Sequence, residues 1–226
     1  AEFFIDEASK IESVANTLSE GIECSLKIAV YEVFPQHLLY LALSHINEQY
    51  PLVKIELIES VLNGANELLT NAVVDLAITS IALYGINCHS LCDIEFIAVA
   101  HPDHPLHQRT EPLTYRELKL HRQIVVRDSA THTSHDDGWL GADMRWTVSH
   151  LRNSIDMVSQ NFGYAWLPSA QIKPYLKNNT LKPLNLEQGT TRSLKLYLMC
   201  TDNDRLGPVG QAFTQHLISL CNNEPG

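Results

Sequence analysis

The chain has 226 residues, 45% of them hydrophobic, and a formal net charge of −10 from 26 acidic residues against 16 Lys and Arg. This is enough apolar material for a buried core in one large domain or two smaller ones, so we expect a soluble globular protein. The acidic balance argues against DNA binding by this chain alone, because nucleic-acid affinity rests mainly on clustered Lys and Arg.

Membrane and export signals are missing from the sequence pattern. No window approaches the roughly 20 apolar residues that span a bilayer, and the first residues, AEFFIDEASKIE, lack the basic flank and apolar run of a secretory signal. We therefore expect a cytoplasmic location and no membrane partner. Five cysteines without a repeated CxxC spacing favour reduced thiols, although a redox switch at Cys88 and Cys92 stays open. Nothing in the sequence indicates a cofactor.

The first half of the chain alternates between helix and strand patterns. Residues 6–20 place apolar side chains at helical spacing, and Gly21 follows as a stop. Strands are predicted at 25–33, 53–60 and 75–80, and helices at 35–50 and 65–74. A β-α-β-α-β run with helices of this length predicts a parallel sheet with helices on its faces.

The second half repeats this pattern in altered form. Thr114 and Glu117 predict a capping box before a short helix that ends near Leu120. Strands are predicted at 93–100, 123–129, 145–149, 163–168 and 193–201, and helices at 151–162 and 207–221. The segment IKPYLKNNTLKPL is expected to descend to the surface between them.

Ligands of parallel sheets bind beyond the carboxyl ends of the strands, which here are residues 31–35, 60–64 and 79–80. Val33 and Phe34 at a helix start would present backbone amides to an anion, or would simply pack beneath the helix. Thr79 and Ser80 would donate hydroxyls to a ligand, or would cap the chain turn locally.

Four motifs occur in order over residues 21–221: LKIAVYEVFPQHLL, then QYPLVKIELIE with VVDLAITS, then VAHPDHPL, and then QNFGYAWLP. Together they resemble the effector-binding regulatory domain of LysR-type transcriptional regulators. The resemblance implies an α/β fold of two Rossmann-like lobes joined by crossover strands, the type 2 periplasmic-binding-protein fold. Lobe I would comprise 21–98 and 193–226, lobe II 99–192, and residues 1–20 would be the tail of a linker helix.

The resemblance also implies a function. It indicates the effector-sensing domain of a bacterial regulator, which binds a small anionic or aromatic metabolite between the lobes and works as a homodimer or tetramer. DNA would be bound only through an N-terminal winged helix-turn-helix domain outside this chain. A periplasmic-type solute-binding receptor of the same fold is the alternative. A small α/β enzyme is a third reading, but we find no catalytic residues and expect none.

Matching the motifs to the family assigns residues to roles. Those expected to bind the ligand are Val33, Phe34, Thr79, Ser80, His101, Ser129, Val148, Ser149 and Phe162. The family commonly pairs through a helix of each lobe, here about 36–50 and 152–162, and this makes Leu39, Leu43 and Met157 candidates for the seam. Ala72 and Asn161 depart from the small residues usual at their positions, and bulkier side chains there would reshape the ligand cleft.

Two histidine-rich stretches invite a metal hypothesis. HPDHPL contains His101 and His104, with His107 just beyond, but its prolines break the helical spacing that metal-binding histidines use, and a structural turn is the expected reading. THTSHDD, with His132, His135, Asp136 and Asp137, is expected to be a solvated loop, with metal or effector contact as the alternatives. We therefore predict no metal site.

Overall fold

A computed structural model of the protein describes residues 23–132, 139–201 and 206–223. The helix predicted at 6–20 lies outside these residues. The chain divides into two compact units. Unit 1 takes in the described residues up to Glu59, Ala65–Cys92 and those from Leu196 on, and unit 2 consists of Ser60–Gly64 and Asp93–Lys195. In the described part of the chain, no helix is long and apolar enough to cross a membrane.

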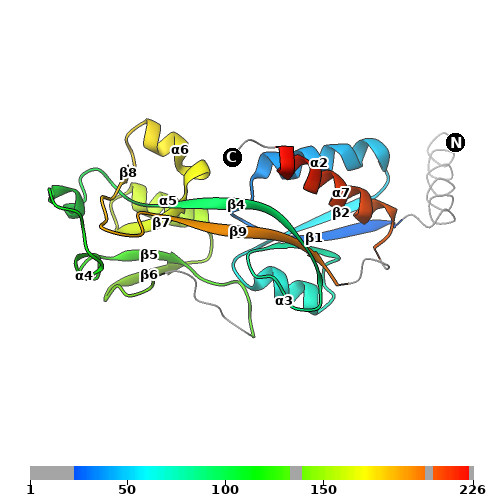
Figure 1. The fold of residues 1–226 in the computed structure, drawn as a ribbon, viewed down its shortest axis with the longest axis horizontal. Coiled ribbons are helices and arrows are strands. Elements are labelled where there is room, and N and C mark those ends of the chain that lie inside the picture. The colour runs from blue at the N-terminus through cyan, green and yellow to red at the C-terminus, as the bar shows by residue number, and fades with distance from the viewer. Residues whose placement is uncertain (1–22, 133–138, 202–205, 224–226) are drawn as a thin grey trace, which may run out of the picture. The chain divides into compact units, whose positions relative to one another are not determined.

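Unit 1 is a sheet with helices on both faces. Its elements are β1 (Ser25–Tyr31), α2 (Gln36–Gln49), β2 (Lys54–Ser60), α3 (Gly64–Thr70), β3 (Leu76–Thr79) and α7 (Pro208–Asn223). The strand order is β2-β1-β3-β9, in which β1 runs parallel to β3 and the end of β9 (Thr191–Cys200) runs antiparallel to β3. Helices α2 and α7 lie together on one face of this sheet, and α3 lies on the other (Figure 1).

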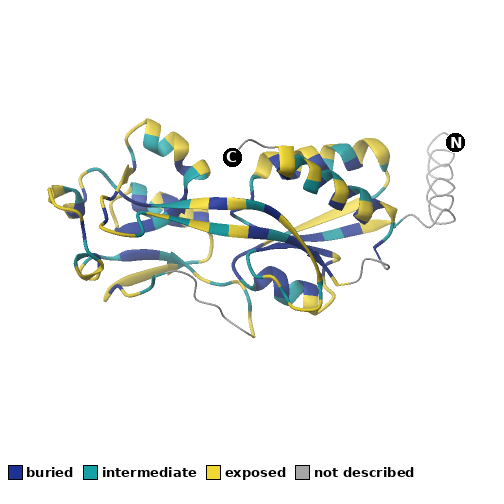
Figure 2. Cartoon of the chain, viewed as in Figure 1, coloured by how far each residue is buried: buried dark blue, intermediate teal, exposed yellow. Residues whose placement is uncertain are grey.

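The core of unit 1 follows from the hydrophobic pattern of these elements. Ile28, Leu76 and Ile78 on the central strands are fully buried. Figure 2 shows the dark blue of buried residues along the strands of this sheet. Helix α2 buries residues at helical spacing, including Leu38, Ala42 and Ile46. Burial of side chains of this size contributes about 1.5–3 kcal/mol each, so the alternation of strand and helix is fixed by these apolar faces.

Unit 2 is built on the same plan. Its elements are β4 (Asn87–Ala100), the 3-10 helix η1 (Pro105–Gln108), α4 (Tyr115–Leu118), β5 (Gln123–Val126), β6 (Arg145–Val148), α5 (Leu151–Ser159), β7 (Tyr164–Pro168), α6 (Ser169–Lys177), β8 (Lys182–Pro183) and β9 (Thr191–Cys200). The strand order is β4-β7-β5-β6, and β8 also pairs with β4. Strand β5 runs parallel to β6 and β7, whereas β4 is antiparallel to β7. The chain passes between the units within the long strands β4 and β9. This is the predicted α/β fold.

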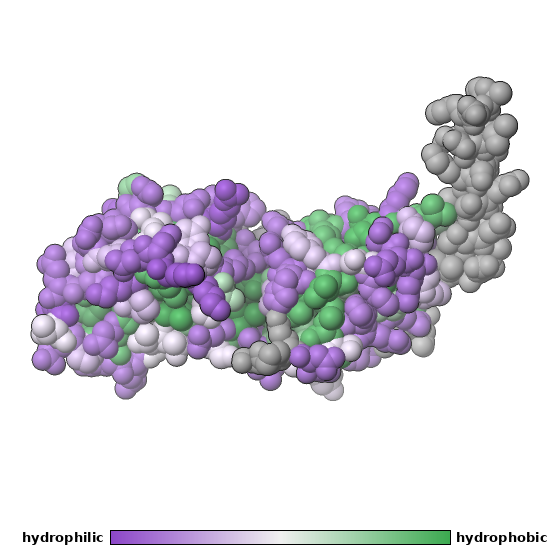
Figure 3. Space-filling model, turned by 90° about the horizontal axis from the view of Figure 1, so that it is seen from above, coloured by the Kyte–Doolittle hydropathy of each residue, from purple (hydrophilic) through white to green (hydrophobic). Residues whose placement is uncertain are grey.

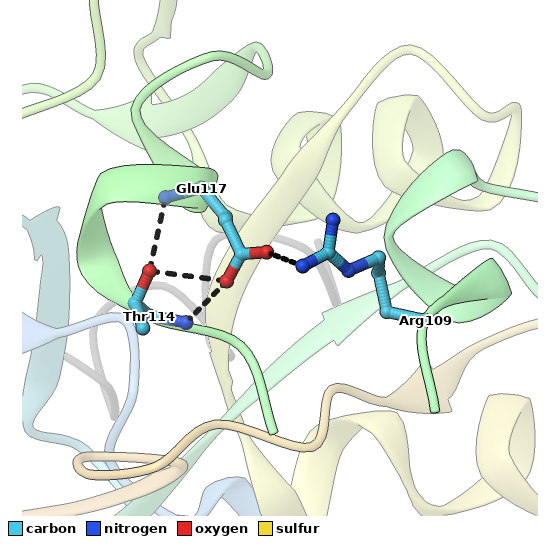
Figure 4. A network of polar contacts seen from close by, with 3 residues as sticks. All are labelled: Arg109, Thr114 and Glu117. Carbon is cyan, nitrogen blue, oxygen red and sulfur yellow. Dashed lines mark hydrogen bonds and ion pairs between the residues drawn. The ribbon is translucent and has the colours of Figure 1, made fainter. Parts of the chain in front are cut away.

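The predicted capping box is present at the start of α4 (Figure 4). The Thr114 amide donates to the Glu117 carboxylate over 2.9 Å, and the Glu117 amide donates to the Thr114 hydroxyl over 3.3 Å. Arg109 forms an ion pair with the same carboxylate. Hydrogen bonds from Thr114 and the charge of Arg109 lower the pKa of Glu117. The box satisfies amides that a four-residue helix would otherwise leave open.

Three helices end in a left-handed residue that is not glycine: α6, with Asn179 at φ 58°, and the helices α3 and α5. Ala72 follows α3 with φ 54°, and Asn161 follows α5 with φ 63°. In both cases the next amide bonds back five residues, from Val73 to the Leu68 carbonyl over 2.9 Å and from Phe162 to the Met157 carbonyl over 3.1 Å. This is the Schellman geometry, in which glycine is favoured because it has no Cβ. Ala72 and Asn161, the two residues that depart from the family pattern, therefore affect the turns that end these helices. Neither residue lines a pocket described below.

Helix α6 was not predicted, because Pro174 interrupts the sequence in which it forms. Proline lacks the amide that an interior helical position normally donates, so IKPYLK has little helical signal of its own. Its one fully buried residue, Ile172, and the packing of the helix against β7 supply the missing stabilisation. Strand β4 is also longer than predicted, since it begins at Asn87 rather than at residue 93.

Candidate functional site

A candidate binding cavity with a volume of about 650 Å³ lies in unit 2. We call it the unit-2 pocket. It is formed by the end of β5 and the loop after it, by β6, by the start of α5 and by Leu62. Its lining residues are Leu62, Val125, Val126, Arg127, Asp128, Ser129, Ala130, Thr131, Leu140, Arg145, Thr147, Ser149 and His150.

Strand geometry places the basic groups of this pocket. The Arg127 amide donates to the Val148 carbonyl over 2.9 Å, which extends the β5–β6 pairing to the pocket edge. Arg145 and Thr147 lie two residues apart on β6 and share the face that lines the pocket. Trp146 between them faces the other way, where Arg122 stacks on its ring at 3.9 Å. The alternation of β6 thus separates a polar pocket from an aromatic contact.

The unit-2 pocket favours an anion. Within the described part of the chain, neither Arg127 nor Arg145 is paired with a carboxylate. Ser149 and His150 stand at the N-terminus of α5, where backbone amides and the helix dipole attract negative charge. The lining also includes Val125, Val126 and Leu140. Charged donors beside apolar walls suit a small organic acid.

Asp128 and Ser129 are bound to the segment Val61–Gly64, which belongs to the same unit. The Val61 amide donates to the Ser129 hydroxyl over 2.8 Å, and that hydroxyl donates to the Val61 carbonyl over 3.1 Å. The Ser129 amide also donates to the Val61 carbonyl, over 3.2 Å. The Asn63 amide donates to Asp128 Oδ1 over 3.1 Å, and Ala130 donates to the same oxygen over 2.9 Å. Ser129 therefore lines the pocket with its hydroxyl already engaged.

The residues expected to bind ligand in unit 1 are mostly buried in its core. Val33 and Phe34 are buried, and the Phe34 amide donates to the Tyr31 carbonyl over 2.9 Å, so it is not free for an anion. Thr79 is fully buried, and its hydroxyl accepts from the Ile81 amide over 3.2 Å. These are the local packing and capping roles that sequence reasoning left open. Ser80 is half-buried and lines neither the unit-2 pocket nor the unit 1 cavity described below.

Of the other residues expected to bind ligand, some line the unit-2 pocket and others lie outside it. Ser149 lines the unit-2 pocket with Ser129. Val148 contributes its carbonyl to the Arg127 amide, and Phe162 packs against Trp146 with ring centroids 5.5 Å apart, outside the pocket. His101 also lies outside it. Sequence reasoning missed Arg145, Thr147 and His150, although Arg145 and Thr147 sit two apart on a predicted strand beside a predicted site residue.

A second cavity, of about 490 Å³, lies in unit 1. It is lined by Val30, Tyr31, Glu32, Phe34, Gln36, Leu39, Tyr40, Leu57, Ile58 and Glu59. Its charged side chains, Glu32 and Glu59, are both acidic, so it lacks the charge that would hold an organic acid. Of the residues predicted to bind ligand, only Phe34 reaches it.

The histidine stretch forms a turn. The His101 ring accepts from the Asp103 amide over 3.2 Å, and the His104 ring accepts from the Leu106 amide over 3.2 Å at the start of η1. Burial, together with the nearby imidazoles, lowers the pKa of His104 to about 4. Among the described residues, no group of three or more His, Cys, Asp or Glu side chains is placed to hold a metal ion. His135, Asp136 and Asp137 lie outside the described residues, and none of the five cysteines, all in the described part of the chain, forms a disulfide.

Comparisons with known proteins agree on one family. A model of the LysR substrate binding domain matches residues 19–222. The HTH-type transcriptional regulator YeeY of Escherichia coli K12 is 27% identical over 179 residues, which cover 76% of this chain and 57% of YeeY. The chain therefore spans little more than half the length of that relative.

Solved structures share the fold at low identity. The regulatory domain of MetR, a LysR family regulator from Neisseria meningitidis, matches with a TM-score of 0.65 and 22% identity, over 87% of this chain and 93% of MetR. The regulatory domain of CcmR from Synechocystis PCC6803, in complex with 2-PG, matches with a TM-score of 0.66 and 16% identity, over 89% of this chain and 99% of CcmR. Because the family model covers nearly the whole described fold, this chain belongs to the LysR substrate-binding domain family.

Proposed function

We propose that this domain senses a small organic anion in the unit-2 pocket and forms the regulatory part of a LysR-type transcriptional regulator. The observation that carries the proposal is the pair of guanidinium groups, Arg127 and Arg145, which line one pocket without a carboxylate partner in the described part of the chain. A guanidinium binds a carboxylate or phosphate through two parallel hydrogen bonds, so each arginine selects for an acidic group.

The family favours a sensor over the alternatives. The relatives are transcriptional regulators, which argues against a solute receptor and against an enzyme. CcmR was solved with 2-PG and QuiR with shikimate, an organic acid, so domains of this fold accept acidic ligands. DNA binding would reside in an N-terminal domain outside this chain, and a regulator of this kind would act in the cytoplasm.

The dimer or tetramer expected from the family needs an apolar surface. Leu39 is only 5% exposed and is part of the unit 1 core, so it cannot carry a subunit contact. The exposed apolar side chains of α2 are Tyr40 and Leu41, at 57% and 51%. Figure 3 views the side of unit 1 that carries α2 and shows apolar surface among polar side chains. These two residues are better candidates for a seam than Leu39, whereas Leu43 and Met157 are half-buried.

A thermal-shift screen with small carboxylates, phosphorylated acids, neutral aromatics and amino acids tests the proposal, because a ligand of the folded state raises Tm. We expect a saturable shift from acids only. The variants Arg127→Gln and Arg145→Gln should each weaken binding about tenfold, the effect of losing one charge-assisted contact. Arg116→Gln is the matched control, since Arg116 is exposed on α4 and does not line the pocket. Equal losses in all three variants, or binding of neutral compounds only, would contradict the proposal.

A further inference from the structure

We propose that Asp128 and Ser129 form a latch on Val61–Gly64 that opposes binding of an anion in the unit-2 pocket. The inference rests on the proposed function, because it concerns how the same pocket is regulated. It assigns Asp128 the role of the pocket's own resident anion. An external anion would then bind at the expense of the hydrogen bonds that hold the latch.

The latch forms part of the wall of the pocket in which a ligand would bind. Leu62, Asp128 and Ser129 all line the unit-2 pocket together with Arg127 and Arg145. The hydrogen bonds of the latch run from the amides of Val61, Asn63 and Ser129 and from the Ser129 hydroxyl, over 2.8–3.2 Å. A molecule that fills the pocket would therefore contact Asp128 and Ser129, the two residues whose side chains hold the latch.

Close packing leaves the latch little room to adjust. A Cβ added to Gly64 would overlap the Ser129 hydroxyl and would lie 3.1 Å from its Cβ and 3.3 Å from its carbonyl carbon. Glycine at 64 thus permits an approach that any larger residue would block. Tightly packed contacts of this kind exist in discrete arrangements, so a ligand would release the latch as a step and not by small adjustments.

Electrostatic repulsion makes the Asp128 carboxylate and an external anion compete for the unit-2 pocket. The Asp128 carboxylate lines the same pocket as Arg127 and Arg145, so a second negative group brought into this pocket would be repelled by it. Like charges a few ångströms apart in a partly solvated site interact strongly enough to change affinity by a factor of ten or more. A weakly charged solute would be excluded, whereas an acid able to engage both arginines would bind and displace the latch.

If the anion and the closed latch exclude each other, amide hydrogen exchange should change in a way that ordinary ligand binding does not produce. A ligand usually slows hydrogen exchange of the amides around its site, because it stabilises the folded state. If the anion displaces the latch, the amides of Val61 and Asn63 lose their acceptors on Ser129 and Asp128. Their exchange should then become faster on binding while exchange elsewhere in unit 2 becomes slower.

The test measures anion affinity and amide exchange by NMR on this 226-residue chain, with inorganic phosphate and succinate as probes at constant ionic strength. Asp128→Asn removes the charge and keeps an oxygen acceptor, so we expect at least tenfold tighter binding of either probe. Asp75→Asn is the matched control: its carboxylate accepts from the Lys27 amide over 2.7 Å in unit 1, and its removal changes the net charge equally. In the unmodified chain, saturating probe should speed exchange at Val61 and Asn63.

The outcomes separate the latch from the pocket. Binding that depends on Arg127 but is unchanged or weaker in Asp128→Asn, or slower exchange at Val61 and Asn63 on binding, overturns the latch and leaves the proposed function standing. If phosphate or succinate binds to the Asp128→Asn variant and not to the unmodified chain, the result supports the latch. No binding of phosphate or succinate to either protein overturns both. The exchange measurement needs no variant, so the inference stays testable if Asp128→Asn fails to fold.

Discussion

Replacement of Gly64 by alanine tests the packing on which the unit-2 pocket depends. The new Cβ would overlap the Ser129 hydroxyl, which must move together with its backbone because the Ser129 Cβ and carbonyl carbon are only 3.1 and 3.3 Å from the new atom. Movement of Ser129 breaks two hydrogen bonds with Val61, of 2.8 and 3.1 Å. It leaves the Val61 amide, in a buried residue, without its acceptor.

The expected loss can be worked out from these contacts. Two side-chain hydrogen bonds contribute about 1 kcal/mol each, and an unsatisfied buried amide adds roughly 1–3 kcal/mol. Alanine is the better helix former by about 1 kcal/mol, which offsets part of the loss at the start of α3. We expect Gly64→Ala to lower the free energy of unfolding by about 2–4 kcal/mol.

A double-mutant cycle with Ser129→Ala isolates the contact. The single variant Ser129→Ala removes the same two hydrogen bonds and the same acceptor of the Val61 amide, so it should cost about 3–5 kcal/mol. In the Ser129→Ala background the overlapping hydroxyl is gone, so Gly64→Ala should lower the free energy of unfolding clearly less than it does in the unmodified chain. The coupling energy between the two substitutions should exceed about 1 kcal/mol. Urea unfolding followed by circular dichroism gives the four free energies. Equal costs of Gly64→Ala in both backgrounds, or a loss below about 0.5 kcal/mol, would refute the reasoning.

Two further predictions concern pH and backbone turns. Burial, and after it the charge of His121 and the other nearby histidines, lowers the pKa of His104 to about 4, below the unfolded value of 6.5. The unfolded chain therefore binds a proton first: stability is fully present above pH 6.5 and falls as pH drops from 6.5 towards 4, by up to about 3 kcal/mol. Urea midpoints at pH 7.5 and 4.5 should show a smaller fall in His104→Asn, and an equal fall would count against this account. Ala72→Gly should raise the free energy of unfolding by about 0.5–1 kcal/mol, because Ala72 has φ 54°. Asn161→Gly, at φ 63°, should gain less because asparagine tolerates this region, so equal gains in the same urea assay would contradict the strain argument.

Patterns with a short range in the sequence determined most of the fold. The apolar runs of β1 and β3 and the helical spacing of α2 identify these elements without any knowledge of their partners, because each must bury its own apolar face. The Thr114 and Glu117 box is equally local, since both partners lie within one turn. Element order then predicts an α/β fold.

Tertiary structure decided what the local pattern leaves ambiguous. Helix α6 contains Pro174, and its stabilisation comes from packing against β7 and burial of Ile172. Ser129 looked free to bind a ligand, yet its hydroxyl is bound to Val61, 68 residues away. No sequence rule pairs two such distant residues, because their proximity depends on how the strands and loops between them pack.

For the unit-2 pocket, too, the sequence determined some features and the tertiary structure decided others. The sequence indicates the carboxyl ends of strands as the place for a ligand, because helix starts and free amides gather there. It does not indicate that Arg145, at the start of β6, would share a pocket with Arg127 beyond the end of β5. Residue identities fix the charge available, whereas the alternation of side chains and the pairing of β5 with β6 decide which charges meet. The sequence by itself therefore determined the family and the fold, and only the tertiary structure decided the chemistry of the pocket, because binding depends on distances between residues that are remote along the chain.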